Sequence, residues 1–297
     1  MNAFVRVVEA GNFTKAAESL SLPNASVTRQ IQSLEQDLKV LLLHRTTRAV
    51  TVTAEGATYY ERVVRLLSDL ADIESSTRQS SAKPVGTVRV DVPAAIATMV
   101  LVPALGDFRR AYPDVKIELG VGNRHTDLVA EGVDCVIRAG EVSEQFLVAR
   151  RIGGFRFATC ATPAFLDEHG TPTSPEEVPF YPTVGLAGGS GGRVQPFRFT
   201  RGGVQHRFTL EHTLVVNDTN AYLAAGLAGL GLIQAPCYTI DAAVLDGRLV
   251  SLLDEWHPDE SPVHVLYAPN RYLSAKVRVF IDWTVDLFER HEHLRRG

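Results

Sequence analysis

NASVTRQIQSLEQDL, residues 24–38, decides how the N-terminal part of this chain folds. Its apolar residues recur at i, i+4, i+7 and i+11, which is the spacing of an amphipathic helix. Pro23 stands just before the stretch, where proline cannot continue an earlier helix but is tolerated in the first turn of a new one. The pattern therefore predicts a helix with Val27, Ile31, Leu34 and Leu38 in the core. Its free polar face consists of Asn24, Ala25, Thr28, Arg29 and Gln32.

Two shorter helical patterns precede this stretch, and a strand pattern follows it. The first, residues 4–8, is apolar on one side and stops at Gly11, and the second, residues 14–20, has a face of small residues and can be capped by Asn12 or Thr14. Residues 45–53 alternate β-branched side chains, which predicts a short strand or wing. Three short helices with a wing form a DNA-binding shape in which the third helix enters the major groove.

The residue types on both predicted surfaces suit DNA. Arginine can pair bidentately with guanine, asparagine or glutamine can pair with adenine, and threonine offers a hydroxyl or methyl contact. Residues 24–52 carry four basic and two acidic side chains, so the net charge is 4 − 2 = +2. One copy should therefore bind weakly, and two or more copies should cooperate on one site. The wing is expected to hold phosphate or enter the minor groove through Arg45, Thr46, Thr47 and Arg48.

A long helix is predicted from about residue 54 to residue 80. Apolar residues recur along it in steps of four and three, which is a heptad seam. Such a helix is roughly 40 Å long and apolar on one side, so it is expected to pair with its copy in a second subunit. Residues 75–84, rich in serine and ending in Lys-Pro, indicate a linker beyond it. The dimerisation seam is predicted to consist of Tyr59, Val63, Leu66, Leu70 and Ile73.

From residue 85 onward, strands and helices alternate. The β-α-β-α-β order of residues 87–139 predicts a parallel sheet with helices on both faces. We predict strands here at 87–92, 115–121 and 133–139, and helices at 100–111 and 125–131. A second set of strands is predicted near 155–161, 183–186, 213–216 and 231–234, with helices near 163–168 and 219–228, a strand at 262–268 and a closing helix at 274–290.

These patterns predict a multidomain α+β and α/β chain. Residues 1–53 are expected to form a winged helix-turn-helix, residues 54–84 a dimerisation helix and hinge, and residues 85–297 a two-lobed α/β domain. Within that domain, lobe I is expected at about 85–160 and 265–297, and lobe II at about 161–264.

Several motifs resemble a known family. The sequences NFTKAA (12–17), SVTRQI (26–31) followed by Leu34-Glu35, LLHRTTR (42–48) and TVTAEG (51–56) are similar to the helix-turn-helix and wing of LysR-type transcription regulators. PVGTVRV (84–90), DLVAEGVD (127–134), IRAG (137–140) and Asn217-Asp218 resemble the effector domain of the CrgA-like branch. The resemblance implies a DNA-binding regulator with two lobes like those of periplasmic binding proteins, holding a small effector between them. It also implies promoter DNA and RNA polymerase as partners, the latter for an activator, and a homodimer or homotetramer.

The chain departs from the family pattern at two positions of the third helix. Family members usually have glycine where Lys39 ends that helix, so a left-handed cap there is expected to be lost or strained by roughly 1 kcal/mol. Pro23 replaces the usual polar cap. Both departures concern the entry angle of the helix rather than the fold.

The effector is expected where the strands of the α/β domain end. Ligands in open α/β sheets bind at the carboxyl ends of strands, and helix N-termini there favour an anion such as a carboxylate. Arg124 and Arg138 either add positive charge to this site or form structural ion pairs with Asp127 or Glu141. The candidate effector-binding residues are Pro93, Ala94, Ala95, Thr98, Gly122, Asn123, Arg124, Arg138, Gly140, Gly188, Asn217, Asp218 and Thr219.

Other function classes fit the sequence less well. The net charge of −4 argues against a protein that coats nucleic acid non-specifically. The three cysteines are far apart, and no metal, cofactor or catalytic motif is visible, so we expect neither an enzyme nor a metal site. The absence of a signal peptide or membrane span favours a reduced, cytoplasmic compartment. The main alternative is a two-lobed solute-binding protein that its first 80 residues dimerise, and a two-lobed enzyme is the third possibility.

Overall fold

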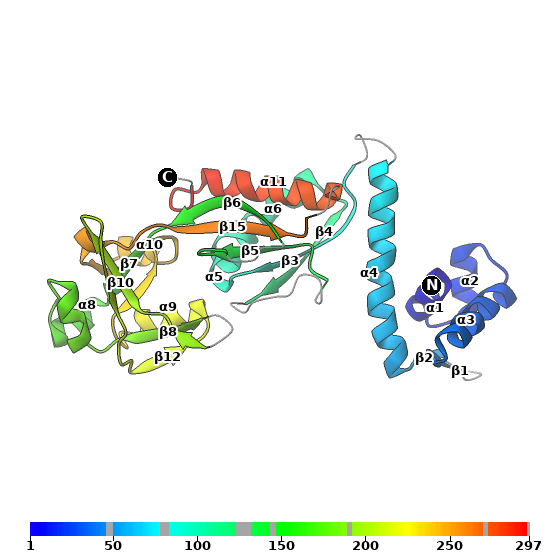
Figure 1. The fold of residues 1–297 in the computed structure, drawn as a ribbon, viewed down its shortest axis with the longest axis horizontal. Coiled ribbons are helices and arrows are strands. Elements are labelled where there is room, and N and C mark those ends of the chain that lie inside the picture. Colours follow the sequence, from blue (N-terminus) through cyan, green and yellow to red (C-terminus); the bar gives the residue numbers. More distant parts are fainter. Residues whose placement is uncertain are drawn as a thin grey trace. The chain divides into compact units, whose positions relative to one another are not determined.

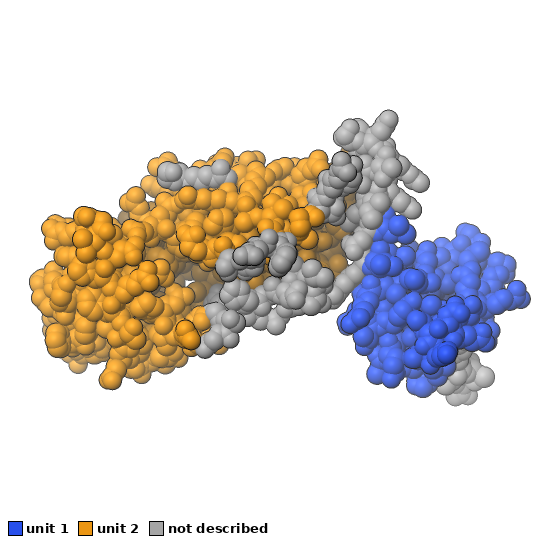
Figure 2. Space-filling model, in the orientation of Figure 1, with its two compact units in different colours: residues 1–82 blue, residues 83–297 orange. Residues whose placement is uncertain are grey.

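The computed structural model describes residues 1–45, 50–77, 83–122, 132–142, 147–188, 192–269 and 273–295. The chain forms two compact units, residues 1–82 and residues 83–297 (Figure 2). Each unit has a core of its own and is described separately. No helix of the described residues is long and apolar enough to cross a membrane.

The first unit contains the predicted three helices, followed by two short strands and a long helix. Val27 and Ile31 are fully buried against Phe4 and Ala16, and Leu34 packs against this core, but Leu38, the fourth residue of the predicted stripe, is 40% exposed. The Asn12 side chain caps the second helix by accepting a hydrogen bond of 2.7 Å from the Thr14 amide. The elements are α1 (Asn2–Ala10), α2 (Phe13–Leu20), α3 (Asn24–Leu38), β1 (Leu43–Arg45), β2 (Val50–Val52) and α4 (Ala54–Thr77).

Helix α3 keeps a left-handed cap although a lysine occupies it. Lys39 has φ 54° and ψ 34°, and the following amide of Val40 donates 3.1 Å to the Glu35 carbonyl. The expected cap is therefore retained in a strained conformation. The Glu35 carboxylate also accepts hydrogen bonds from the amides of Leu42 and Leu43, at 2.9 and 3.1 Å. These bonds fix the start of β1 to the end of α3.

The first part of α4 packs into the unit's own core, contrary to the seam that we predicted. Val63 is buried in the same cluster as Phe4, and the Tyr59 ring lies edge-on to Phe4 with centroids 5.5 Å apart. Gly56 allows this approach, because a Cβ there would lie 2.1 Å from the Leu42 carbonyl oxygen. Val63 is therefore a core residue of this unit and is not available as a seam residue, whereas Tyr59 is half-buried against the same core.

Lobe I of the second unit contains a mixed five-stranded sheet rather than a wholly parallel one. β3, β4 and β5 run parallel, but β15 is antiparallel to both β5 and β6. The parallel arrangement predicted for the strands of residues 87–139 is confirmed, and the sheet is mixed because β15 returns from the other lobe late in the chain. In spatial order the strands are β4 (Val115–Val121), β3 (Gly86–Val92), β5 (Cys135–Ala139), β15 (Ser261–Tyr267) and β6 (Val148–Phe155).

Helices α6 (Val102–Ala111) and α11 (Ala275–Arg290) pack on this sheet (Figure 1). Phe108 of α6 meets Phe280 and Trp283 of α11 with ring centroids 5.8 and 5.1 Å apart. The helix after β3 begins six residues before the predicted Val100, as α5 (Ala94–Ile96) and a π turn (Ala97–Leu101). These early residues are nearly all buried, so they give no amphipathic signal. The helix predicted at 125–131 lies outside the described residues.

Lobe II has two three-stranded sheets and a separate hairpin. β13, β7 and β14 are antiparallel, whereas β12 is parallel and β9 antiparallel to β8. The sequence analysis missed helix α10, strands β9 and β14 and the hairpin. The elements are β7 (Phe157–Ala161), α8 (Pro163–His169), β8 (Val184–Gly188), β9 (Arg193–Val194), β10 (Phe197–Arg201), β11 (Val204–Phe208), β12 (Leu214–Val216), α9 (Thr219–Leu227), β13 (Ile233–Pro236), α10 (Cys237–Leu245) and β14 (Val250–Leu252), with 3₁₀ turns at Pro175–Phe180 and Asp254–Trp256.

The chain crosses between the lobes earlier than the predicted positions. β6 belongs to the lobe I sheet and β7 to lobe II, so the first crossing is at Arg156 rather than after residue 160. The return crossing precedes Ser261, because the whole of β15 pairs in lobe I, whereas we expected it near residue 265. The single strand predicted at 155–161 is thus the end of one strand and the whole of another.

Candidate functional site

The polar face predicted for α3 is free of the core. Ala25, Arg29 and Gln32 are exposed, and Thr28 is half-buried. The Asn24 side chain is exposed too, but its amide nitrogen donates 3.2 Å to the Thr14 hydroxyl, and its oxygen lies 3.5 Å from the Thr28 hydroxyl. Asn24 therefore fastens α3 to α2, and Arg29 and Gln32 keep their full hydrogen-bonding capacity for a ligand.

The wing is described only at its base. Arg45 ends β1 and lies opposite Val50 of β2 in an antiparallel register. Thr46, Thr47 and Arg48, predicted to contact phosphate or the minor groove, lie outside the described residues, as does the side chain of Arg45.

Two of the predicted seam residues remain on the surface of α4. Leu66 and Leu70 are 54% and 49% exposed, which is high for leucine. They are one helical turn apart, so they form one short apolar strip. The side chain of Ile73 lies outside the described residues.

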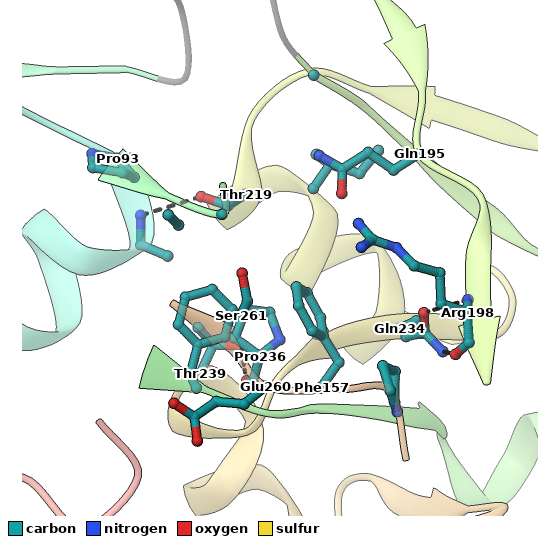
Figure 3. A pocket seen from close by; sticks show the side chains of 18 of the residues that line it. Pro93, Phe157, Gln195, Arg198, Thr219, Gln234, Pro236, Thr239, Glu260 and Ser261 are labelled. Carbon is teal, nitrogen blue, oxygen red and sulfur yellow. Dashed lines mark hydrogen bonds between the residues drawn. The ribbon is translucent and has the colours of Figure 1, made fainter. Parts of the chain in front are cut away.

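A cavity of about 560 Å³ lies between the two lobes of the second unit (Figure 3). Its size is that of a site for a small organic molecule. Pro93, Ala95, Gly122, Arg138, Gly140, Gly188 and Thr219 line it, as we predicted. Ala94, Thr98, Asn217 and Asp218 do not line it, and Asn123 and Arg124 lie outside the described residues.

The helix ends at the cavity are already satisfied by side chains. The Ala95 amide donates 3.1 Å to the Thr219 hydroxyl across the lobes, and the Asp218 carboxylate accepts from the amides of Asn220 and Ala221 at 3.0 and 2.9 Å. The Thr98 hydroxyl lies 3.2 Å from the Asn220 amide oxygen, a second polar contact between the lobes. Because the Ala95, Asn220 and Ala221 N–H groups have partners, they are poor candidates for holding an anion.

Arg138 is paired within the protein with Asp91, which we did not expect as its partner. Its Nη2 lies 3.9 Å from Oδ2 of Asp91, and the two side chains are only 14% and 9% exposed. Asp91 is on the neighbouring strand β3, and Asp127, one of the two partners that we expected, lies outside the described residues. This pair offsets most of the positive charge that Arg138 would bring to the cavity.

The sequence analysis missed two arginines that line the cavity from the hairpin β10–β11. Arg198 and Arg207 are directly opposite each other in the antiparallel register, and both line the cavity. In Figure 3 the Arg198 side chain extends toward the middle of the cavity, near Gln195. Among the described residues neither guanidinium has a carboxylate within 4.0 Å, and the one polar contact is 3.4 Å from Arg207 Nη2 to the Gln205 amide oxygen.

Gln234 holds the Arg198 backbone in place. Its amide oxygen accepts 2.9 Å from the Arg198 N–H, and its amide nitrogen donates 2.8 Å to the Arg198 carbonyl. The Tyr222 hydroxyl in turn accepts 2.9 Å from the Gln234 N–H. The signal for this hairpin was present in the sequence, since FRFTRGGVQHRF (197–208) alternates apolar and polar residues around a Gly-Gly turn.

The other sides of the cavity include aromatic side chains and the acidic residues Glu141, Asp259 and Glu260. Phe155 lies edge-on to Phe157 and to Tyr238, with ring centroids 5.2 and 5.3 Å apart. Burial raises the pKa of Tyr238, so its phenol stays neutral. Asp259 accepts a hydrogen bond from Gln205, and Glu260 is paired with Arg151 and points away from Arg198 in Figure 3.

Comparisons with known proteins agree with this two-part architecture. Residues 1–57 match the family model of the bacterial regulatory helix-turn-helix protein, LysR family, and residues 81–289 match that of the LysR substrate binding domain. The chain is 36% identical over 294 residues to the uncharacterised HTH-type transcriptional regulator YhjC of Escherichia coli, covering 98% of this chain and 97% of that one. It is 30% identical over 287 residues to the HTH-type transcriptional regulator CrgA of Neisseria meningitidis, covering 96% and 95%.

Solved full-length structures have the same fold. CrgA from Neisseria meningitidis aligns with a TM-score of 0.63 at 29% identity, covering 96% of both chains. The virulence activator AphB from Vibrio cholerae aligns with a TM-score of 0.61 at 28% identity, covering 96% of this chain and 97% of that one. These relatives are transcriptional regulators rather than enzymes or solute-binding proteins. The chain therefore belongs to the LysR family of transcriptional regulators and consists of a DNA-binding helix-turn-helix domain and an effector-binding domain.

Proposed function

We propose that this regulator binds promoter DNA through α3 and the wing, and that a carboxylate-bearing effector in the cleft between the lobes controls that binding. The observation that carries the effector part is the pair Arg198 and Arg207, two cations without a carboxylate partner among the described residues, facing a cavity with an aromatic wall. Arginine binds carboxylate bidentately, and a partly enclosed site strengthens that bond.

For DNA we assign base contacts to Arg29 and Gln32, with Asn24, Ala25 and Thr28 close by on the same face. Arg29 suits guanine and Gln32 suits adenine. Arg45, Thr46, Thr47 and Arg48 remain our candidates for phosphate or the minor groove. Since residues 24–52 carry only +2, we propose that a homodimer or homotetramer presents at least two modules to one promoter in the cytoplasm. RNA polymerase is a further partner if the protein activates.

Control by the effector follows from where the lobes touch. The Ala95–Thr219 and Thr98–Asn220 contacts join the lobes beside the cavity. An effector that binds more tightly to the open or to the closed arrangement of the two lobes shifts the population of molecules toward that arrangement. We propose that this shift changes the spacing of the paired DNA-binding domains.

A thermal-shift screen of carboxylates on the full chain tests the effector part. We expect carboxylates to raise the Tm, and Arg198→Gln to remove that increase, because ligand binding to the native state stabilises it. Arg193→Gln is the matched control, since Arg193 is an exposed arginine of the same lobe that does not line the cavity. Stabilisation by neutral sugars or cations alone, with Arg198→Gln behaving like the parent, would refute an anionic effector.

A further inference from the structure

We infer that the effector carries two negative charges at one end, as a pair of neighbouring carboxylates or as a phosphomonoester. Arg198 and Arg207 then each bind one carboxylate of the pair, or different oxygens of the phosphate. This inference rests on the proposed function, because it specifies the anion that the cleft takes.

The register places the two arginines side by side on one face. The Gly202-Gly203 turn closes the hairpin, and Arg198 is opposite Arg207. The Arg198 N–H and carbonyl bond to Gln234 and not to β11, so this is a non-hydrogen-bonded pair, in which side chains lie closest. Their Cβ atoms are then about 5 Å apart.

The whole of this face is polar and lines the cavity. Thr200 and Gln205 are the next opposite pair on it, and both are lining residues. Phe199 and Phe208, on the other face, pack into the apolar core of lobe II. One side of the hairpin thus packs on the core, and the other side presents two guanidinium groups and a hydroxyl to the cavity.

Two like charges directly opposite each other on a sheet destabilise it. Other arginines near this face have acidic partners, since Arg201 is paired with Glu255 and Arg151 with Glu260. Arg198 and Arg207 have none among the described residues. A singly charged ligand would leave one of the two guanidinium groups uncompensated, whereas a dianion neutralises both and removes their repulsion.

Two aromatic lining residues set the nature of the rest of the ligand. Phe157 and Tyr238 present aromatic surface to the same cavity. A cavity of about 560 Å³ accommodates a dianionic head joined to a ring-sized apolar body. The suitable probes are therefore phthalate, with two adjacent carboxylates, phenyl phosphate, and benzoate as the monoanion that matches both in its ring.

The experiment measures the dissociation constants of these three probes for the full chain at pH 7.5 by calorimetry. We expect phthalate or phenyl phosphate to bind at least about tenfold more tightly than benzoate, which corresponds to one additional charge-assisted contact. The one of the two that binds more tightly identifies the kind of dianion. Arg207→Gln should reduce that preference to about twofold or less, while Arg198→Gln weakens all three probes.

A control and a ligand-free measurement complete the test. Arg201→Gln removes an arginine from the same hairpin that pairs with Glu255 outside the cavity, and it should leave the preference unchanged. Without ligand, Arg207→Gln should raise the Tm by about 1–2 °C, because it removes the like-charge repulsion.

The outcomes separate the two proposals. If benzoate binds as tightly as the dianions and Arg198→Gln abolishes its binding, the dianion inference fails and the anionic effector stands. An unchanged preference in Arg207→Gln also overturns the inference. If none of the three probes binds and the ligand-free Tm of Arg207→Gln does not rise, the inference fails, and the thermal-shift screen decides the proposed function by itself.

Discussion

Lys39 is one of two non-glycine residues in the described part of the DNA-binding domain with a left-handed backbone, and Ser21 is the other. Lys39 ends α3 at φ 54°, a conformation that glycine adopts without cost and lysine does not. We expect Lys39→Gly to stabilise this domain by about 1 kcal/mol, measured as slower hydrogen exchange of the α2 and α3 amides in the full chain. Lys39→Ala is the control and should give no gain, because alanine keeps the strain. Equal exchange in the glycine variant and the parent would contradict the strain.

His212 makes the stability of the effector domain depend on pH. Burial lowers the pKa of His212 below its ordinary value of 6.5, and its Nδ1 lies 2.9 Å from the Thr183 hydroxyl. The unfolded chain therefore takes up a proton at a higher pH than the folded chain does. Stability is then fully present above about pH 6.5 and is lost as the pH falls below that value.

Urea unfolding at pH 7.5 and at pH 5.5 measures this effect. We expect the parent to lose stability at the lower pH and His212→Gln to lose less between the two conditions. His291, whose pKa is also lowered by burial, contributes in the same direction, so the variant should retain part of the slope. Identical pH dependence in His212→Gln and the parent would exclude His212 as a source.

At the scale of single elements, amphipathic periodicity predicted best where one side of an element faces solvent. The strand at Val115–Val121 has the predicted bounds, and α3 has its predicted core stripe except for the exposed Leu38. Periodicity failed at Ala94–Ile96, which is buried all round. In α4 the apolar residues recur in heptad steps, but part of that apolar side packs in the chain's own core. The sequence pattern alone does not distinguish packing in the chain's own core from packing against a second subunit.

The binding site was predicted from topology and missed in its chemistry. The rule that ligands bind at strand ends located seven lining residues. It could not show that Asp218 and Thr219 already occupy the helix N–H groups, because this depends on side-chain rotamers. It also could not place Arg198 and Arg207, since a hairpin far along the chain supplies them.

Helix α4 is expected to dimerise the protein through the strip of Leu66 and Leu70. The double variant Leu66→Lys, Leu70→Lys should dissociate the dimer in sedimentation analysis, because it places charge in an apolar interface. Specific DNA affinity should then fall by a factor of about 10²–10⁴, the gain that a second tethered module provides. Glu61→Lys, on an exposed position of the same helix, is the control for added charge. A double variant that stays dimeric would rule out this strip as the interface.

At the scale of the whole molecule, two units of different kinds are joined in one chain. The first unit presents an exposed polar helix face, and the second encloses a cavity between two lobes joined by the Ala95–Thr219 and Thr98–Asn220 contacts. The central claim is that binding in the cavity changes binding at the helix face. This requires that an effector have different affinities for the two arrangements of the lobes.

The most direct test is a DNase footprint of the full chain on the promoter region beside its own gene, with and without phthalate or phenyl phosphate. We predict a protected site that weakens with salt, that shifts or changes in extent when the effector binds, and that Arg29→Ala weakens by about 10- to 100-fold. Arg6→Ala is the matched control, since Arg6 is an exposed arginine of α1 paired with Glu9. Absence of protection, or a footprint that neither Arg29→Ala nor the effector alters, would contradict the account.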